Sequence, residues 1–366
     1  MDTTKKSKWI KVRELLKNAK VLDKSVEQRK EGMLKPHLQE YNTSVYRTKY
    51  KIDRLRANTL ISSGGLLNIN GYMFLTAKEK FDDINVISKP GNSGSGSIVI
   101  LLKKARQQFI LKITFVNAYN ATPLNLPDTE AKMYAIMNIL VSKNITPHVF
   151  MLVGGFDQNI DRNIIDKPFN TWLKNYEVGF HDDKFVYPIM TETANDDSKL
   201  LTLNAFITNM NKPTLSLKPQ QIDDIYYNIL FQIFYTLQCF INIGVKHNDL
   251  HFGNIFILMR PKNILKLTNK PTVYRKYRYK DEKGATQTVQ LQNIGLDVRI
   301  YDFDRSVKHK NTFRYYPDSL RSKFISDFHS IGTNEKKNNH SDLYKVLCHL
   351  YHNKFVPQTI KDFVLA

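Results

Sequence analysis

The sequence predicts an α+β fold in which a small antiparallel sheet is followed by a mainly helical half. Residues 84–116 read as strand, glycine-rich turn, strand, polar turn and strand, with the apolar runs typical of buried strands. From Gln220 to Ile243 the apolar residues recur at helical spacing, and Gly244 follows as a C-terminal stop. A chain of 366 residues, 42% of them hydrophobic, is long enough to bury a core of this mixed kind.

Further elements are expected between the meander and the long helix. Residues 128–144 read as a helix with Asp128 or Thr129 near its cap. The runs at residues 148–156 and 185–193 are strand-like. The first half of the chain is therefore expected to be a small sheet with one helix.

The N-terminal segment is a basic extension. Its first 60 residues hold 16 basic and 7 acidic side chains, a net charge of +9. Apolar residues at helical spacing from Trp9 to Leu22 indicate an amphipathic helix. This helix either packs on the outside of the main domain or contacts nucleic acid or a membrane.

The bulk composition indicates a cytoplasmic protein with an anionic partner. The formal charge of +20 and the isoelectric point near 9.6 suit nucleic acid, an acidic membrane surface, acidic proteins or nucleotide phosphates. Only Cys239 and Cys348 are present, so neither a disulfide framework nor a cysteine-rich zinc site is expected. No apolar run approaches the roughly 18 to 20 residues that span a bilayer, and the first residues lack the apolar core of a signal peptide.

A glycine turn, a strand lysine and a helix glutamate follow one another along the first half. The turn PGNSGSGS lets backbone amides approach an anion, although a flexible hairpin loop has the same composition. Sixteen residues after Gly96, Lys112 lies in the apolar strand FILKITF, where an unpaired ammonium is costly to bury. Glu130, eighteen residues further on, offers a partner, although such a pair taken alone is more typical of a surface.

The stretch GVKHNDLHFGNIFIL packs four polar side chains into eight residues directly after the long helix. Asp249 and Asn254 have the spacing of a kinase catalytic loop, in which a carboxylate orients a hydroxyl and an amide oxygen binds a metal ion. Forty-eight residues later, Asp302 ends a strand-like run as a candidate carboxylate for magnesium. A zinc site at His247 and His251 is the alternative, but no cysteine or third histidine lies nearby.

Together these motifs resemble the protein kinase superfamily. GNSGSGSIV, FILKI, Glu130, HNDLHFGN and YDFD follow in the family's order over residues 84 to about 305. The resemblance implies a two-lobed protein-kinase-like fold with a small antiparallel-sheet N-lobe and an abbreviated, mainly helical C-lobe. The extension would then be residues 1–80, the N-lobe with its hinge 81–194, and the C-lobe 195–366.

The resemblance also implies a site for ATP with Mg²⁺ or Mn²⁺. Asp249 would orient the attacking hydroxyl and accept its proton, while Lys112 would hold the nucleotide phosphates with Glu130 as its partner. Asn254 and Asp302 would bind the metal ion. The remaining cofactor contacts would come from the glycine turn and the hinge, at Gly91, Ser93, Gly94, Gly96, Glu192 and Ala194.

Three residues depart from the family's pattern. Asn248 stands where an arginine is usual, so we expect no pocket for an activation-loop phosphate and an activity that needs no such phosphorylation. His251 stands where serine/threonine kinases usually have lysine, and HxDLHxGN also resembles aminoglycoside and choline kinases. Asp304 replaces the usual glycine, which should stiffen the metal loop.

The C-terminal part carries a basic insert at about residues 260–292. From Arg260 to Lys283 it has nine basic and two acidic side chains, and a hairpin projecting near the active site is expected. Its alternating tyrosines and basic residues suit either a grip on nucleic acid or acidic protein or a solvated strand. These residues are Tyr274, Arg275, Lys276, Tyr277, Arg278 and Tyr279.

The chain after Asp304 is short for a kinase. Asp342, near the start of a predicted helix, matches the family's aspartate that braces the catalytic loop. With the DFD motif, these features resemble kinases of large DNA viruses, including the poxvirus virion-assembly type. A viral protein of this kind would act in the host cytoplasm or the virion.

The sequence thus predicts a serine/threonine-protein kinase that transfers the γ-phosphate of ATP to protein substrates, acidic ones among them. The alternatives are a small-molecule phosphotransferase of the aminoglycoside or choline kinase type and a catalytically silent, kinase-like scaffold that binds nucleic acid. The basic extension and insert would contact nucleic acid or an acidic membrane.

Overall fold

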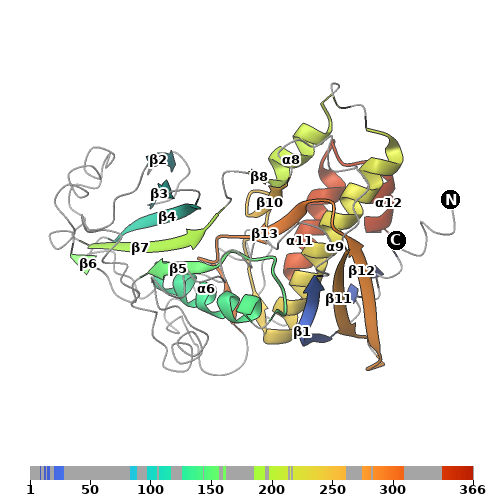
Figure 1. The fold of residues 1–366 in the computed structure, drawn as a ribbon, viewed down its shortest axis with the longest axis horizontal. Helices are drawn as coiled ribbons and strands as arrows, with labels where there is room; N and C mark the ends of the chain where they lie inside the picture. The colour runs from blue at the N-terminus through green and yellow to red at the C-terminus, as the bar shows by residue number, and fades with distance from the viewer. Residues whose placement is uncertain are drawn as a thin grey trace.

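The described residues form a mixed α and β fold with small antiparallel sheets, as the sequence predicts (Figure 1). The computed structural model describes residues 9, 12–13, 15–16, 20–28, 83–88, 97–104, 107–116, 126–142, 144–155, 160–161, 185–193, 198–212, 215, 217–260, 274–281, 283–308 and 340–365. Within these ranges, no helix has both the length and the apolar character that a membrane span requires.

The largest sheet has six antiparallel strands in the order β2-β3-β4-β7-β5, with β6 pairing to β7. Its strands are β2 Asp83–Ser88, β3 Ser97–Lys104, β4 Gln107–Val116, β5 Leu152–Gly155, β6 Ile160–Asp161 and β7 Phe185–Glu192. The predicted meander is therefore confirmed. Lys112 of β4 lies between Val99 of β3 and Ile189 of β7, so it occupies the middle of the sheet.

Helix α6, Leu126–Ser142, lies beside this sheet (Figure 1). It begins at Leu126, so Asp128 and Thr129 lie in its first turn near the cap, as predicted, together with Pro127, whose φ is preset for a helix. Asn138 ties the helix to β5, because its side chain donates to the carbonyl of Leu152 at 3.0 Å and accepts from the same residue's N–H at 2.8 Å.

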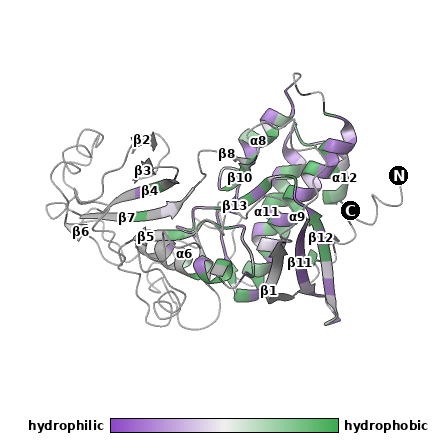
Figure 2. Cartoon of the chain, viewed as in Figure 1, coloured by the Kyte–Doolittle hydropathy of each residue, from purple (hydrophilic) through white to green (hydrophobic). Residues whose placement is uncertain are grey.

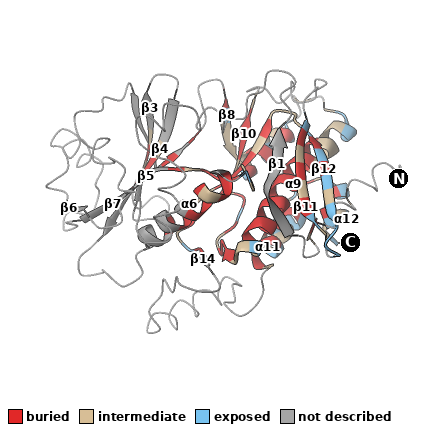
Figure 3. Ribbon diagram, turned by 60° about the horizontal axis from the view of Figure 1, so that its bottom comes forward, coloured by how far each residue is buried: buried red, intermediate tan, exposed pale blue. Residues whose placement is uncertain are grey.

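Among the described residues, four helices belong to the C-terminal core, with α9 at its centre (Figure 1). They are α8 Leu203–Met210, α9 Pro219–Ile243, α11 Ser341–His352 and α12 Gln358–Leu365. Nearly every side chain of α9 from Ile225 to Phe240 is buried (Figure 3). The helix ends as predicted at Gly244, whose φ of 71° is a left-handed conformation that glycine adopts without strain.

Two small sheets hold the loops that carry the polar motifs, one in the order β13-β10-β8 and the other pairing β14 with β9. The strands are β8 Lys199–Thr202, β9 Val245–Lys246, β10 Ile255–Met259, β13 Leu296–Ile300 and β14 Val307–Lys308. Strands β9 and β10 bound residues 247–254, and β13 and β14 bound residues 301–306. Because β10 pairs with β13 and β9 with β14, the two loops are fixed side by side at both ends.

The predicted basic hairpin is present, but it does not project alone, because a third strand pairs with it. Strands β11, Tyr274–Lys280, and β12, Thr286–Gln292, pair antiparallel, and β1, Lys20–Gln28, adds a third strand. Leu22 therefore lies in a strand, and its assignment to a helical face is wrong. Strand β1 becomes a partner of β11 across most of the chain length, a pairing that no local pattern indicates.

One face of β11 belongs to the core. Tyr277 and Tyr279 are buried, and Tyr277 packs against Phe231 and Tyr235 of α9. Buried Arg275 forms an ion pair with Asp297 of 2.6 Å. The proposed grip on nucleic acid by these three side chains is therefore wrong. Hydropathy does not show this burial, because β11 is coloured as hydrophilic in Figure 2.

The described part of the N-terminal helix packs on the outside of this core. Val12 and Leu15 are buried, and the ring of Trp9 lies 4.3 Å from that of Phe363 in α12 and 5.3 Å from that of Tyr227 in α9. Of the two interpretations of this helix, the packed one is confirmed for these residues. The rest of the extension up to residue 80, apart from β1, lies outside the described residues.

Candidate active site

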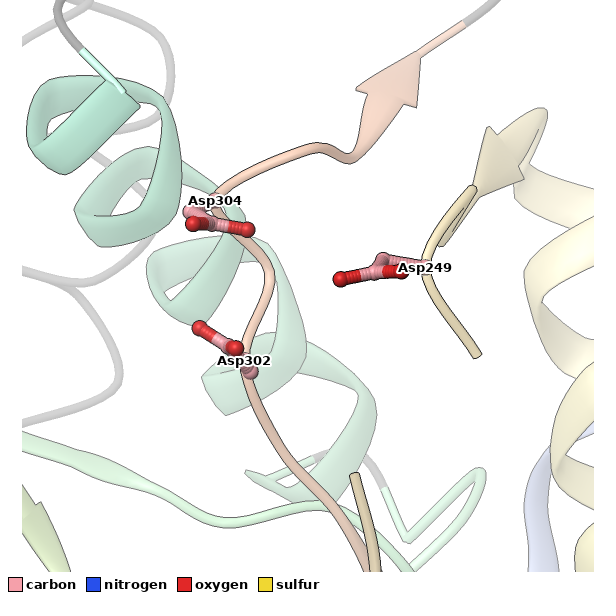
Figure 4. A group of neighbouring side chains, drawn as sticks. All are labelled: Asp249, Asp302 and Asp304. Carbon is pink, nitrogen blue, oxygen red and sulfur yellow. The ribbon is translucent and has the colours of Figure 1, made fainter. Parts of the chain in front are cut away.

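Three carboxylates converge between the two clamped loops. Asp249 projects from residues 247–254, and Asp302 and Asp304 project from residues 301–306 (Figure 4). One oxygen from each of the three lies within 4.8 Å of the others. Like charges at this separation repel each other, so the cluster favours a bound cation or a retained proton.

The crowding of the three carboxylates affects the pKa of Asp304. Burial and the neighbouring carboxylate of Asp302 raise the pKa of Asp304 to about 6. Its Oδ1 atom is buried and has no hydrogen-bond partner among the described residues. Hard oxygen donors of this kind are the ligands that Mg²⁺ and Mn²⁺ prefer, so the residues fit such an ion.

Lys112 joins the sheet and α6 to the metal loop. Its Nζ donates to Oε2 of Glu130 at 2.8 Å and to Oδ1 of Asp302 at 2.9 Å. Glu130 is only 1% exposed, and burial raises its pKa although Lys112 opposes that shift. Burial lowers the pKa of Lys112, but the two carboxylates outweigh it and hold that pKa well above its ordinary value. Lys112 is therefore a cation at neutral pH, gripped from both sides.

Asp302 has an unusual backbone that is held by aromatic neighbours. Its φ of 68° lies in the left-handed region, which aspartate tolerates better than most residues. Its N–H donates to the hydroxyl of buried Tyr134 at 3.2 Å. The next residue, Phe303, is buried against Tyr134, Phe240 and His247. Burial raises the pKa of Asp302, but Lys112 more than offsets this and lowers it overall.

Asn254 links the two loops. Its side-chain amide nitrogen donates to the backbone carbonyl of Asp249 at 2.9 Å. Its backbone carbonyl accepts from the N–H of Tyr301 at 3.0 Å. Because the amide nitrogen is used inside the loop, the amide oxygen is the ligand atom that Asn254 offers to a metal ion.

Helix α11 braces the loop of Asp249. The carboxylate of buried Asp342 accepts from the backbone N–H of His247 at 2.6 Å and of Asn248 at 2.9 Å. The contact expected of Asp342 is therefore present. Asn248 also donates from its side chain to the carbonyl of Arg305 at 3.0 Å, which ties the loop to the segment after Asp304.

The two histidines have separate local contacts. His247 Nε2 lies 2.9 Å from the carbonyl oxygen of Tyr301, whereas exposed His251 accepts from the N–H of Gly253 at 3.0 Å through Nδ1. Among the described residues, neither belongs to a group with metal-ligand geometry.

Several predicted cofactor contacts are not among the described residues. Gly91, Ser93, Gly94, Gly96 and Ala194 lie outside the described residues, so they stay predictions. The backbone of Glu192 ends β7 opposite Phe109, as a strand leading to a hinge requires.

Sequence reasoning missed two residues of this site. Asp304 was expected only to stiffen the loop, although a second carboxylate two residues after Asp302 is itself a signal for a cation site. Tyr134, the hydrogen-bond acceptor for Asp302, carries no sequence signal, because its position on α6 is that of an ordinary core residue.

Comparison with known proteins gives one relative by sequence. Over 261 residues the chain is 24% identical to "Putative serine/threonine-protein kinase R400" of Acanthamoeba polyphaga mimivirus. The match covers 65% of this chain, and the chain spans about half, 50%, of that protein. No protein-family model matches the sequence.

Among solved structures, the chain is similar to "WaaP in complex with acyl carrier protein", with a TM-score of 0.36 and 11% identity over 80% of this chain and 84% of that one. A TM-score this low carries no argument about the fold. The sequence similarity to the mimivirus protein, by contrast, supports a kinase-like superfamily.

Proposed function

We propose that the chain is an ATP-dependent protein kinase with a two-lobed fold, which transfers the γ-phosphate to serine or threonine hydroxyls of proteins. The observation that carries the proposal is Lys112, held between Glu130 and Asp302 while Asp249 faces Asp302 from the other loop. Phosphoryl transfer needs little covalent chemistry from the protein, so a phosphate-binding cation, metal ligands and an oriented carboxylate suffice.

In this proposal Lys112 binds the α- and β-phosphates of ATP. Glu130 keeps the lysine oriented, since it is buried and bonded to Nζ at 2.8 Å. Asp302 shares the same ammonium, so nucleotide binding and the metal loop are coupled through one side chain. Backbone amides from Gly91 to Gly96 would cover the phosphates.

Asp302, Asp304 and Asn254 would hold Mg²⁺ or Mn²⁺, for which their oxygen atoms are suited. When bound, such an ion neutralises charge on the nucleotide phosphates. Asp304 extends the donor set expected from the sequence, and its unpartnered buried Oδ1 agrees with a ligand role. Asp249 is left to orient the acceptor hydroxyl and accept its proton.

A small-molecule phosphotransferase is the second candidate, and His251 is the observation that favours it. His251 stands where serine/threonine kinases usually have lysine, and it is exposed next to Asp249. Its Nδ1 accepts a hydrogen bond from Gly253, so that nitrogen carries no proton to offer to a phosphate. The acceptor therefore has to be identified by experiment.

The test is transfer from labelled ATP with Mg²⁺ or Mn²⁺ to casein and, in parallel, to a panel of amino alcohols. We expect label in casein with the wild type. Asp302→Ala should abolish transfer and weaken magnesium–nucleotide binding, whereas Asp249→Ala should lose transfer and keep nucleotide binding. Normal turnover in either variant contradicts the assignment. Label in an amino alcohol supports the second candidate, and salt-dependent DNA binding without transfer supports a silent scaffold.

We also propose a viral setting, with action in the host cytoplasm or the virion. The DFD motif of residues 302–304 and the similarity to a mimivirus protein support this. Detection of the chain in purified virions by mass spectrometry would test the virion placement.

A further inference from the structure

One face of α11 lies against the loop that carries Asp249. Asp342, Lys345 and His349 are three and four residues apart, so they follow one another along this face. Asp342 accepts two backbone N–H groups of the loop, and the ring of His349 lies 5.4 Å from that of Phe252. Lys345 lies between these two contacts and makes a third.

The ammonium of Lys345 donates to the backbone carbonyl of Asn248. That carbonyl belongs to the same peptide unit as the N–H of Asp249, so the cation lies within one peptide of the proposed base. The charges facing it are the carboxylates of Asp342 and Asp249 and the guanidinium of Arg305. A hydrogen bond from a charged donor is roughly twice as strong as a neutral one, so this contact restrains the peptide more firmly than an amide would.

Asn248 needs such restraint. Its φ of 65° is in the left-handed region, which asparagine tolerates better than most residues but less freely than glycine. The structure holds it by its N–H through Asp342, by its carbonyl through Lys345 and by its side chain through Arg305. The N–H and the carbonyl of Asn248, which belong to the two successive peptide units that flank this residue, are thus both held from α11.

The loop itself does not supply a comparable charge. His251 is exposed, and its Nδ1 is occupied as an acceptor for Gly253. Two described cations from outside the loop interact with Asp249, namely Arg305, with Nε 3.9 Å from Oδ2, and Lys345. Of these, Arg305 is the more exposed, and only Lys345 is bonded to the loop backbone through its side chain.

We propose that Lys345 is a positioning residue for Asp249: its ammonium fixes the Asn248–Asp249 peptide and places a positive charge beside the carboxylate that orients the acceptor. The inference rests on the proposed function and assigns a role to a residue outside every motif. Lys345 acts through Asp249 and does not need to touch the nucleotide. Its loss should therefore slow turnover and leave nucleotide binding unchanged.

The test compares Lys345→Met with Lys345→Arg and with Lys354→Met, an exposed lysine just beyond α11 that serves as the control. We expect Lys345→Met to lower kcat at least tenfold, with the Kd for Mg·ADP within twofold of wild type. Hydrogen exchange of the amides in residues 247–254 should become at least tenfold faster. Lys345→Arg should restore most of both, because it keeps the charge and a donor, and Lys354→Met should match the wild type.

A kcat and a loop hydrogen exchange that stay at wild-type values in Lys345→Met would overturn the inference. So would a Lys345→Arg variant that restores neither the kcat nor the slow exchange. A loss of nucleotide binding in parallel with kcat would also overturn it, because that indicates general disruption of the fold. If the wild type transfers phosphate to no acceptor, the proposed function fails, but the exchange measurement still decides whether Lys345 holds the loop.

Discussion

Lys112 and Asp302 stand 190 positions apart in the sequence, yet Nζ of the lysine lies 2.9 Å from Oδ1 of the aspartate. One residue lies in the middle of a sheet strand and the other in a loop clamped by two small sheets. Their contact makes the geometry of the metal loop depend on the same cation that would hold the nucleotide. Glu130 completes the arrangement from α6.

Lys112→Met should therefore damage both function and stability. It leaves Glu130 buried without its cation, so we expect a loss of about 3 kcal/mol in the free energy of unfolding. The rate of phosphate transfer should fall at least a hundredfold, since no other described side chain forms an ion pair with both Glu130 and Asp302. Urea unfolding and labelled-ATP transfer are the measurements, and Lys199→Met, an exposed lysine on β8, is the control. Unchanged stability in Lys112→Met would show that the ion pair is not part of the folded protein.

Asp342→Ala tests the brace beneath the loop. Removing the carboxylate strips the acceptor from two buried backbone N–H groups, of His247 and Asn248. Each unsatisfied buried donor costs about 1–3 kcal/mol, so we expect a total loss of about 2–6 kcal/mol in unfolding free energy. Asp362→Ala, on the exposed side of α12, should change stability by less than about 0.5 kcal/mol. A loss no larger than that of this control would contradict the bracing role.

Local patterns predicted those parts of the fold that rest on local physics. The apolar period of α9 and the strand runs of β3 and β4 are set by which faces are buried, so the sequence shows them directly. The pairing of β1 with β11 joins segments about 250 residues apart, and neither segment carries a mark of its partner. Arg275 was expected to face either an external partner or solvent, whereas it pairs with Asp297 inside the core. Hydropathy cannot distinguish these cases, because an arginine scores alike in both.

Some residues of the candidate site were predicted from the sequence and others were not. The sequence predicted Glu130 as the partner of Lys112, because a buried lysine needs a carboxylate, whereas the contact of Lys112 with Asp302 was not predicted. Lys345 and Tyr134 were not identified, because their contacts with the loops depend on how helices dock and no spacing rule encodes that. Motifs therefore identify the reacting groups better than the residues that hold them.

A buried histidine predicts how stability depends on pH. His148 is fully buried, with Nε2 2.8 Å from the hydroxyl of Tyr277, and burial together with Arg275 and Arg299 lowers its pKa well below the ordinary value, against the opposing charge of Asp297. In the unfolded chain His148 binds a proton near pH 6.5, whereas in the folded chain it stays neutral. The unfolded state therefore binds more protons, and stability falls as the pH drops below about 6.5, by up to about 1.4 kcal/mol per pH unit.

Urea unfolding between pH 7 and pH 4.5 measures this dependence. His148→Gln cannot titrate, so its stability should fall with a slope smaller by about one proton than that of the wild type. Other histidines contribute equally to both proteins and cancel in the comparison. Identical slopes would mean that His148 is protonated in the folded state. Below about pH 4 a second loss is expected, because Arg275 and Arg299 outweigh burial and hold the pKa of Asp297 well below its ordinary value.

Asn248 offers a test that separates backbone strain from a side-chain contact. Asn248→Gly keeps the positive φ without strain but loses the 3.0 Å hydrogen bond to the carbonyl of Arg305. Asn248→Ala loses the same bond and adds the strain of a Cβ at that φ, which costs about 1–2 kcal/mol. We expect both variants to transfer phosphate more slowly than the wild type, with alanine the less stable of the two by about 1 kcal/mol in thermal unfolding. Equal stability of the two variants would show that the left-handed conformation is relaxed on substitution.

The same residue predicts independence from activating phosphorylation. An arginine at position 248 would offer a bidentate site for a phosphate on the following segment, whereas Asn248 already ties the loop to Arg305 by its own side chain. We expect protein that has been treated with phosphatase, and shown by mass spectrometry to carry no phosphate between residues 305 and 335, to transfer at a rate within twofold of untreated protein. Autophosphorylation during the assay is controlled by single-turnover measurement of the treated sample. An inactive treated protein that recovers only when a second kinase modifies residues 305–335 would show that Asn248 does not replace the phosphate-binding arginine.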